Sequence, residues 1–340
     1  MRMPNLLPIR RLKVLWVGWT GPEMAEVAGG ILPFDQDPHF YVMGSGSSRD
    51  ESAFFVGNGR KITYFTTAEK FFLDIKACDY DVIIYNTYAY AVWHRPELYP
   101  LGGKVDLLVF HDGWAKIKQF KILLEAESFT QFDFLSKLSG HFDAVITFNQ
   151  VMKDHCDKVG RPCVWTYPPV PANLDDPGLE RDIHVSFSGS NLATGYRGEI
   201  LDVVARLPTQ YRVIAESGAY NNLPVDRWVQ LLRRSIIHQC THSPPTGQRH
   251  PFHLKNREGK AALCGALPVI EAWAEADGFL APGTEKVVFH SFQELHDILI
   301  YYLENDKARQ EIIEAARIRI RAEHTNERLF QRAFLDFKLI

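Results

Sequence analysis

The sequence predicts an α/β protein of two domains, each built on a parallel sheet. Short apolar runs rich in β-branched residues alternate with helical segments over residues 1–166, which is typical of a doubly wound parallel sheet. A proline-rich segment, residues 167–181, cannot hold a helix or an inner strand, and the alternation starts again after it. A chain of 340 residues is also too long for one ordinary core.

The first domain is expected to contain short strands over residues 13–19, 80–86, 105–110, 142–148 and 163–166. Apolar residues recur at helical spacing over residues 67–78, 115–139 and 151–159, which predicts helices there. A glycine- and serine-rich segment, residues 44–60, is expected to form a surface loop.

His111 and Asp112 directly follow the expected strand 105–110. Ligands of open parallel sheets bind beyond the carboxyl ends of the strands, so a histidine and an aspartate at this position could act in acid–base chemistry. The alternative is structural: Asp112 caps the next helix, and His111 bonds to the backbone. The residues alone leave both interpretations open.

The second domain is expected to contain strands over residues 183–188, 211–216, 236–240 and 267–270. Helices are expected over residues 197–207, 225–234, 292–303, 306–322 and 325–337. The first of these strands ends in Ser188, Gly189 and Ser190. A small turn between a strand and a helix can present backbone N–H groups to a phosphate, although a plain turn fits the same residues.

Residues 254–265 combine a basic start with a stripe of small side chains. The residues three, four and seven positions after Glu258 are alanine or glycine, and side chains this small let a helix approach its neighbours closely. Lys255 and Arg257 would lie in the first turn, where the helix dipole disfavours a cation. A bound anion such as phosphate would explain them, and a solvated start of a buried helix is the alternative.

Composition excludes several classes of function. With 46% hydrophobic and 23% charged residues the chain reads as soluble and globular, and its net charge of -3 predicts no nucleic-acid partner and at most peripheral membrane contact. The five cysteines are widely spaced without a CxxC pair, so neither a disulfide framework nor a metal site is expected. No apolar run reaches the length of a signal peptide or a membrane span, so a cytoplasmic location is expected.

Five motifs of the second half occur in a fixed order. They are HVSFSGS at residues 184–190, GYRGEIL around Arg197, LKNREGKAALCGA at 254–266, EADGFLAPGTEKVVF at 275–289 and EHTNER at 323–328. In this order they resemble the donor-binding domain of the GT-B glycosyltransferases, specifically the group related to the CgeB and YkvP spore-maturation proteins. The resemblance covers roughly residues 182–335.

The resemblance implies a GT-B fold, in which two Rossmann-like domains with parallel sheets face each other across a cleft. Residues 1–168 would form the acceptor domain, 169–182 a linker and 183–324 the donor domain, and the helix at 325–340 would return to the first domain. It also implies a hexosyltransferase-like enzyme that moves a sugar from a nucleotide-diphosphate sugar to an unidentified acceptor. Such an enzyme would need no metal or cofactor, and the stereochemistry is left open.

The resemblance also assigns roles to residues of this sequence. On the acceptor side, His111 and Asp112 would serve as base or positioning groups. On the donor side, the diphosphate and sugar would be held by Ser188, Gly189, Ser190, Arg197, Lys255, Arg257, Glu258, Gly265 and Glu271.

Lys260 departs from the family pattern, which has a glutamate at this position. The departure implies either altered donor recognition or a protein that no longer catalyses transfer. The alternatives to an active transferase are therefore a non-catalytic structural or assembly protein of a spore coat or cell envelope, and a nucleotide-sugar epimerase. The retained pair of Lys255 and Arg257 favours binding of a nucleoside diphosphate.

Overall fold

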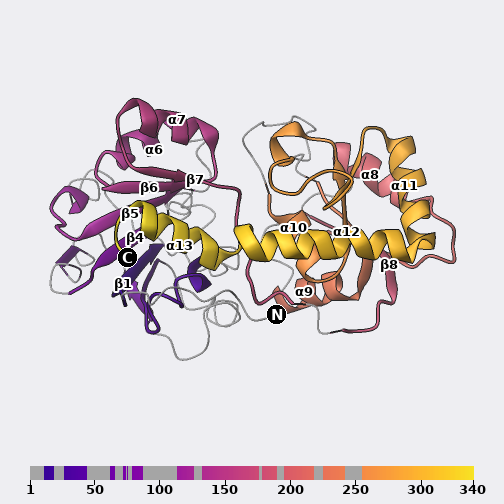
Figure 1. The fold of residues 1–340 in the computed structure, drawn as a ribbon, viewed down its shortest axis with the longest axis horizontal. Helices are drawn as coiled ribbons and strands as arrows, with labels where there is room; N and C mark the ends of the chain where they lie inside the picture. The colour runs from indigo at the N-terminus through magenta and orange to yellow at the C-terminus, as the bar shows by residue number, and fades with distance from the viewer. Residues whose placement is uncertain are drawn as a thin grey trace. The chain divides into compact units, whose positions relative to one another are not determined.

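The computed structural model divides the chain into two compact units. The first unit comprises Met1–Thr166 and Asn326–Ile340, and the second comprises Tyr167–Thr325. Figure 1 shows both units with their helices and strands labelled. The structure describes residues 11–18, 27–43, 62–65, 72–73, 75, 79–86, 113–125, 132–175, 178–189, 195–217, 225–241 and 255–340.

The first unit is built on a seven-stranded sheet in the order β3-β2-β1-β4-β5-β6-β7, with every pairing parallel. The strand order reverses between β1 and β4, where a doubly wound sheet usually binds its ligand. The strands are β1 (Val14–Gly18), β2 (His39–Met43), β3 (Ile62–Phe65), β4 (Val82–Asn86), β5 (Phe120–Glu125), β6 (Ala144–Thr147) and β7 (Cys163–Trp165).

Helices cover both faces of this sheet (Figure 1). The helices α6 (Phe132–Ser139) and α7 (Gln150–Lys158) cover one face. The closing helix α13 (Asn326–Asp336) packs on the other face, where the Phe330 ring lies 6.5 Å from that of Trp16 and the Phe334 ring 5.0 Å from that of Phe34. The last residues of the chain therefore complete the core of the first unit.

The helix predicted over residues 115–139 is wrong, because the fully parallel strand β5 lies inside it. The run FKILLE is continuously apolar at its centre, and such a run fits a buried strand as well as a helix. The strands β2 and β3 were not predicted. The expected strand 105–110, the loop 44–60 and most of the expected helix 67–78 lie outside the described residues.

The second unit is built on a five-stranded sheet in the order β12-β11-β10-β8-β9, again with every pairing parallel. Its strands are β8 (Ile183–Gly189), β9 (Val213–Ser217), β10 (Ser235–Gln239), β11 (Leu267–Glu271) and β12 (Val287–Phe289). Gln239 lies opposite both Phe187 and Val269, so β8, β10 and β11 end at one edge. The order reverses between β8 and β10, at the strand that carries Ser188 and Gly189.

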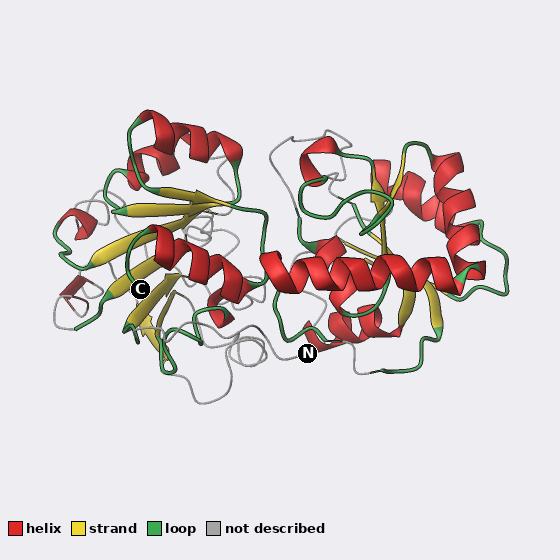
Figure 2. Ribbon diagram, in the orientation of Figure 1, coloured by secondary structure: helices red, strands yellow, loops and turns green. Residues whose placement is uncertain are grey.

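The helices of the second unit surround this sheet (Figure 2). Ser291 caps one of them by accepting a hydrogen bond from the Glu294 N–H at 3.1 Å, as a serine before a helix commonly does. The helices are α8 (Gly195–Ala205), α9 (Val225–Arg234), α10 (Arg257–Leu263), α11 (Phe292–Glu304) and α12 (Asp306–Arg319), with the short turns η3 (Ala274–Ala276) and η4 (Ile320–His324).

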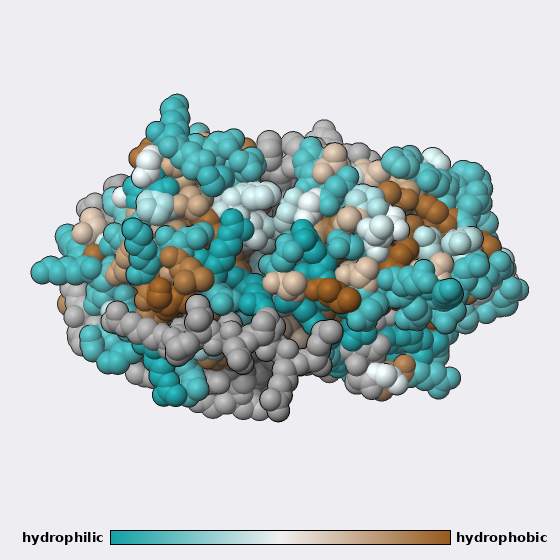
Figure 3. All heavy atoms as spheres, in the orientation of Figure 1, coloured by the Kyte–Doolittle hydropathy of each residue, from teal (hydrophilic) through white to brown (hydrophobic). Residues whose placement is uncertain are grey.

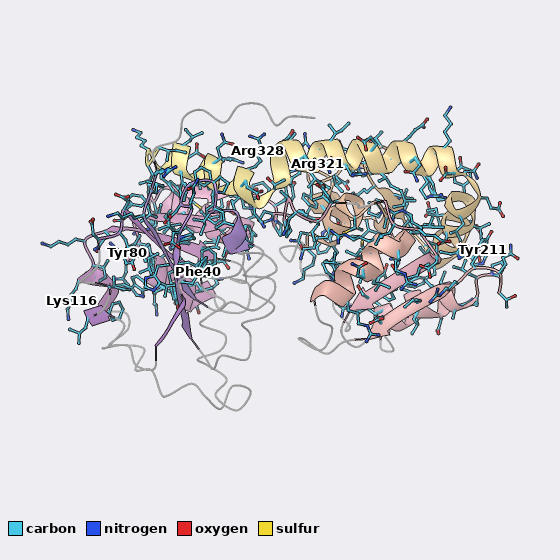
Figure 4. The ribbon with its side chains drawn as sticks, turned by 90° about the horizontal axis from the view of Figure 1, so that it is seen from below. Phe40, Tyr80, Lys116, Tyr211, Arg321 and Arg328 are labelled. Carbon is cyan, nitrogen blue, oxygen red and sulfur yellow. The ribbon has the colours of Figure 1, made fainter. Side chains whose placement is uncertain are left out.

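The expected linker 169–182 is part of the second unit. Val170 and Leu174 are fully buried, and the Val170 N–H donates to the His324 carbonyl at 2.8 Å. Arg321, labelled in Figure 4 where the long helix ends, forms an ion pair with Asp175. The segment is therefore fastened to the second unit by its apolar side chains and by polar contacts, although its prolines keep it from forming a helix.

The prediction of two parallel-sheet α/β domains is confirmed. On the face shown in Figure 3, hydrophobic residues form small, separate areas in a mostly hydrophilic surface. Among the described residues, the exposed large apolar side chains come from different elements: Leu73, Val159, Leu179, Tyr301, Ile318 and Leu335.

Candidate functional site

The carboxyl edge of the second sheet carries the first polar group of the candidate site, at the end of β8. Ser188 is 8% exposed, and its Oγ accepts a hydrogen bond from Nε1 of Trp228 at 3.3 Å. Trp228 belongs to α9, and the ammonium of Lys260 from α10 lies 5.1 Å from the centroid of its ring. The strand end, α9 and α10 thus meet at the ring of Trp228, a residue that sequence analysis did not single out.

A second polar chain runs from α10 to the end of β11. The Arg257 guanidinium donates to the Thr241 carbonyl at 3.4 Å, and the Thr241 hydroxyl donates to Oε1 of Glu271 at 2.9 Å. Thr241, which sequence reasoning missed, therefore joins two of the predicted donor residues. Its place just after β10 was the available signal, because polar residues at the carboxyl ends of parallel strands commonly face the ligand.

Glu258 does not lie at this exposed edge. Its side chain has no exposed surface, and Oε1 lies 3.6 Å from the ammonium of Lys286, which is itself 1% exposed. The prediction that Glu258 contacts the donor is not supported by this placement. Consecutive side chains of a helix are about 100° apart around its axis, so Glu258 can be buried while its neighbour Arg257 reaches the Thr241 carbonyl.

The remaining predicted donor residues have different surroundings. Arg197 is buried at the start of α8, and Lys255 is half-buried just before α10. Gly265 has a φ of 81° directly after the residue that caps α10, a conformation that favours glycine. Gly189 is the last residue of β8. Ser190, His111 and Asp112 lie outside the described residues.

The small residues of α10 have a packing reason. A Cβ on Gly259 would lie 2.7 Å from Cγ2 of Val170 and 2.9 Å from the Phe279 ring, so the helix backbone needs glycine here. Ala261 and Ala262 are fully buried. The prediction that small side chains let this helix approach its neighbours closely is confirmed. The same helix carries Arg257 and Lys260, so its packing also positions these two residues.

Burial controls the titration of His238 beside the site. Burial, assisted by the nearby Arg257 guanidinium, lowers the pKa of His238 to about 3. The imidazole is therefore neutral, with Nδ1 at 2.8 Å from the Ser186 hydroxyl. His238 therefore belongs to the interior of the sheet, where burial favours the uncharged imidazole.

The first sheet also ends in polar residues at its carboxyl edge. Three neighbouring strands finish with Asn86, Glu125 and Thr147, all fully buried. The Thr147 hydroxyl donates to Oε2 of Glu125 at 2.5 Å. Sequence analysis missed Glu125 because β5 was predicted as a helix, which hid the fact that this carboxylate ends a strand.

Within the described ranges, no group of three or more His, Cys, Asp or Glu side chains is arranged to hold a metal ion. No helix in these ranges has both the length and the apolar composition that a membrane span requires.

The chain resembles known protein sequences over residues 197–334 and known structures over nearly its whole length. Residues 197–334 match the family model described as glycosyl transferase-like. No curated protein sequence matches the chain.

Three solved structures illustrate the likeness in fold. HepE from Anabaena, in complex with UDP and glucose, has a TM-score of 0.69 and 14% identity, and the match covers 97% of this chain and 100% of HepE. A glycosyltransferase from Rickettsia africae has a TM-score of 0.62 and 12% identity, with 97% and 98% covered. A putative UDP-N-acetylglucosamine 2-epimerase from Listeria monocytogenes has a TM-score of 0.60 and 10% identity, with 96% of both chains covered. The chain thus has the GT-B fold, and its residues 197–334 match the glycosyl transferase-like family model.

Proposed function

We propose that the chain is a glycosyltransferase that takes its sugar from a nucleotide-diphosphate sugar. The observation that carries the proposal is the convergence of Ser188, Arg257, Lys260 and Glu271 at the carboxyl edge of the second sheet. This edge lies where the strand order reverses, which is the usual ligand position in such sheets. The cations at this edge suit an anionic leaving group such as a diphosphate. The carboxylate of Glu271 suits the hydroxyl groups of a sugar.

On the donor side, Arg257 and Lys255 would take up the charge that develops on the departing diphosphate. Backbone N–H groups after Ser188 and Gly189 would assist them, and Glu271 would accept a hydrogen bond from a donor hydroxyl. The protein cations do the work that a divalent metal does in other transferases, so transfer is expected to proceed without one. UDP is the first nucleotide to test, because HepE was solved with UDP and with UDP-glucose.

The acceptor would bind at the carboxyl edge of the first sheet. Asn86 and Glu125 end neighbouring strands there, beside the point where the strand order reverses. His111 and Asp112 stay candidates for this side from sequence alone. The order of the five motifs supports membership of the CgeB-like group. None of the described residues identifies the acceptor molecule.

Ligand-dependent thermal stabilisation tests the proposal. UDP-, GDP-, ADP-, CMP- and dTDP-sugars are added to the full chain, with and without EDTA. A ligand present at 100 times its dissociation constant is expected to add about 2.7 kcal/mol of stability. Arg257→Ala should abolish the shift, whereas Arg332→Ala, which removes an exposed arginine of α13, should not. Absence of a shift with every nucleotide would leave the structural or assembly role as the better explanation.

An epimerase is the second candidate, because a putative UDP-N-acetylglucosamine 2-epimerase has the same fold. The two activities differ in their products. A transferase breaks the bond between the sugar and the diphosphate and releases UDP, whereas an epimerase returns a different UDP-sugar in which the sugar is still bonded to the diphosphate. Incubation with UDP-N-acetylglucosamine, followed by NMR of the products, separates them.

A further inference from the structure

Lys286 carries a charge in the interior of the second unit. Its side chain is 1% exposed, and its ammonium donates to the Ala276 carbonyl at 2.9 Å. The same nitrogen lies 3.6 Å from the Glu258 carboxylate and 3.4 Å from that of Asp277. A charge buried this deeply is costly unless it is paired, so these three contacts must hold together in the folded protein.

The contacts of Lys286 join separate parts of the donor side. Lys286 comes from the segment that leads into β12, Glu258 from the first turn of α10, and Ala276 from η3, which follows β11. A single ammonium therefore ties α10 to the segment that leaves the end of β11, where Glu271 lies.

The turn that Glu258 occupies also carries Arg257. Because neighbouring residues of a helix share one backbone, a rotation of this turn that moves the Glu258 carboxylate moves Arg257 as well. The bond from Arg257 to the Thr241 carbonyl is 3.4 Å long, at the weak end of the hydrogen-bond range. The ion pair between Lys286 and Glu258, at 3.6 Å in the interior, is therefore a second constraint on this turn.

The same charged groups also influence the buried thiol of Cys240, which directly follows β10. Burial raises the pKa of Cys240 well above its ordinary value; the carboxylates of Glu258 and Glu271 raise it too, whereas Arg257 and Lys286 oppose the shift.

We propose that Lys286 is a positioning residue of the donor site, which acts through Glu258 to hold the α10 turn so that Arg257 meets the diphosphate. Lys286 itself does not touch the nucleotide. Glu258 then serves the donor site from the interior and makes no contact with the sugar. This inference rests on the proposed function and adds to it the residue that orients its principal cation.

The test uses UDP as the probe, with its dissociation constant measured by calorimetry on the full chain. Lys286→Met leaves the Glu258 carboxylate buried without its cation, so the turn is expected to shift toward water and UDP binding to weaken at least tenfold. Combining Lys286→Met with Glu258→Gln removes both charges while keeping the side-chain volume. This double variant lacks the ion pair but leaves no lone buried charge, so it is expected to bind UDP more tightly than Lys286→Met and still several-fold more weakly than the wild type.

Lys121→Met is the matched control. Lys121 is also a buried lysine, and its ammonium bonds the Ile117 carbonyl at 3.1 Å and lies 3.1 Å from the Asp143 carboxylate, but it belongs to the first unit. Its loss should lower the melting temperature without changing UDP affinity. If Lys286→Met does not fold, Glu258→Ala is used in its place. In this variant the Lys286 ammonium retains its contacts with the Asp277 carboxylate and the Ala276 carbonyl. UDP binding should still weaken several-fold.

The possible results separate this inference from the proposed function. If wild-type protein binds UDP and Lys286→Met binds it within twofold as tightly, the positioning role is overturned and the donor site stands. Equal weakening by Lys121→Met would show a general loss of stability and would also overturn the role. Wild-type protein that binds no nucleoside diphosphate overturns the proposed function, and the inference with it.

Discussion

The ammonium of Lys260 lies 5.1 Å from the centroid of the Trp228 ring, and Nε1 of the same ring donates to the Ser188 hydroxyl. An ammonium at this distance from an indole ring is attracted by the negative face of the ring's quadrupole. Lys260 is 6% exposed, so the attraction acts in a largely dry setting. The residue that departs from the family pattern thus has a defined place beside the strand end that is proposed to bind the diphosphate.

Lys260 is expected to add to the cations that hold the diphosphate. Lys260→Met should weaken UDP binding a few-fold, and Lys260→Glu should weaken it more than tenfold, about 1.4 kcal/mol or more, because a carboxylate repels the phosphates. Calorimetry with UDP measures both. A gain of affinity in Lys260→Glu would contradict the prediction and would indicate that the lysine has replaced a productive glutamate.

The closing helix α13 is expected to contribute strongly to the stability of the first unit. Phe334 is fully buried against Phe34, whereas the next residue, Leu335, is 47% exposed. Phe334→Ala should lower the free energy of unfolding by about 3–5 kcal/mol, and Leu335→Ala should change it by less than about 0.5 kcal/mol. Urea denaturation of the two variants checks this. Similar losses for both would show that α13 is not packed on this core.

Much of the fold could be predicted because its strands are short apolar runs with clear ends. The strands β4, β6, β8 and β10 and the helix α9 lie within a residue or two of their expected positions. The strand β5 could not be separated from a helix, because a run such as FKILLE has no alternation of apolar and polar residues to mark a strand.

The candidate site could be predicted less fully than the fold. The motif around Arg257 and the strand end at Ser188 were identified, since glycine, serine and basic residues stand out in an apolar context. Trp228 and Lys286 were not, because their roles depend on which helices and turns meet in space. Sequence spacing also cannot tell that Glu258 faces the interior; that follows from the packing of Gly259 on its neighbours.

His324 is expected to make the second unit less stable in mild acid. Burial, assisted by the nearby Arg319, lowers the pKa of His324 to about 4 from the ordinary 6.5. A histidine that is neutral when folded but takes up a proton when unfolded stabilises the fold fully above pH 6.5, and this contribution is lost as the pH falls from 6.5 to 4. The loss should reach up to about 3 kcal/mol.

Urea denaturation at pH 7, 5.5 and 4.5 measures this dependence. His324→Phe keeps an aromatic ring beside Phe279, whose ring centroid lies 4.8 Å away, and should flatten the slope over this range. His296→Gln, which changes a partly exposed histidine of α11, should leave the slope as in the wild type. A wild-type slope retained in His324→Phe would assign the acid sensitivity to other groups.

Glu125 is expected to serve the acceptor side, and two carboxylates that bridge the same pair of strands provide the test. Glu125 accepts from the Thr147 hydroxyl at the carboxyl ends of β5 and β6, and Asp143 accepts from the Lys121 N–H at their amino ends, at 2.7 Å. Glu125→Gln keeps an oxygen for Thr147 but removes the base. It should therefore slow release of UDP from UDP-glucose about 100-fold, with UDP affinity unchanged.

Asp143→Asn removes the same charge far from the ligand edge, and its rate of UDP release should stay within twofold of the wild type. If the two variants release UDP at similar rates, Glu125 has only a structural role, and the acceptor side must be sought at His111 and Asp112.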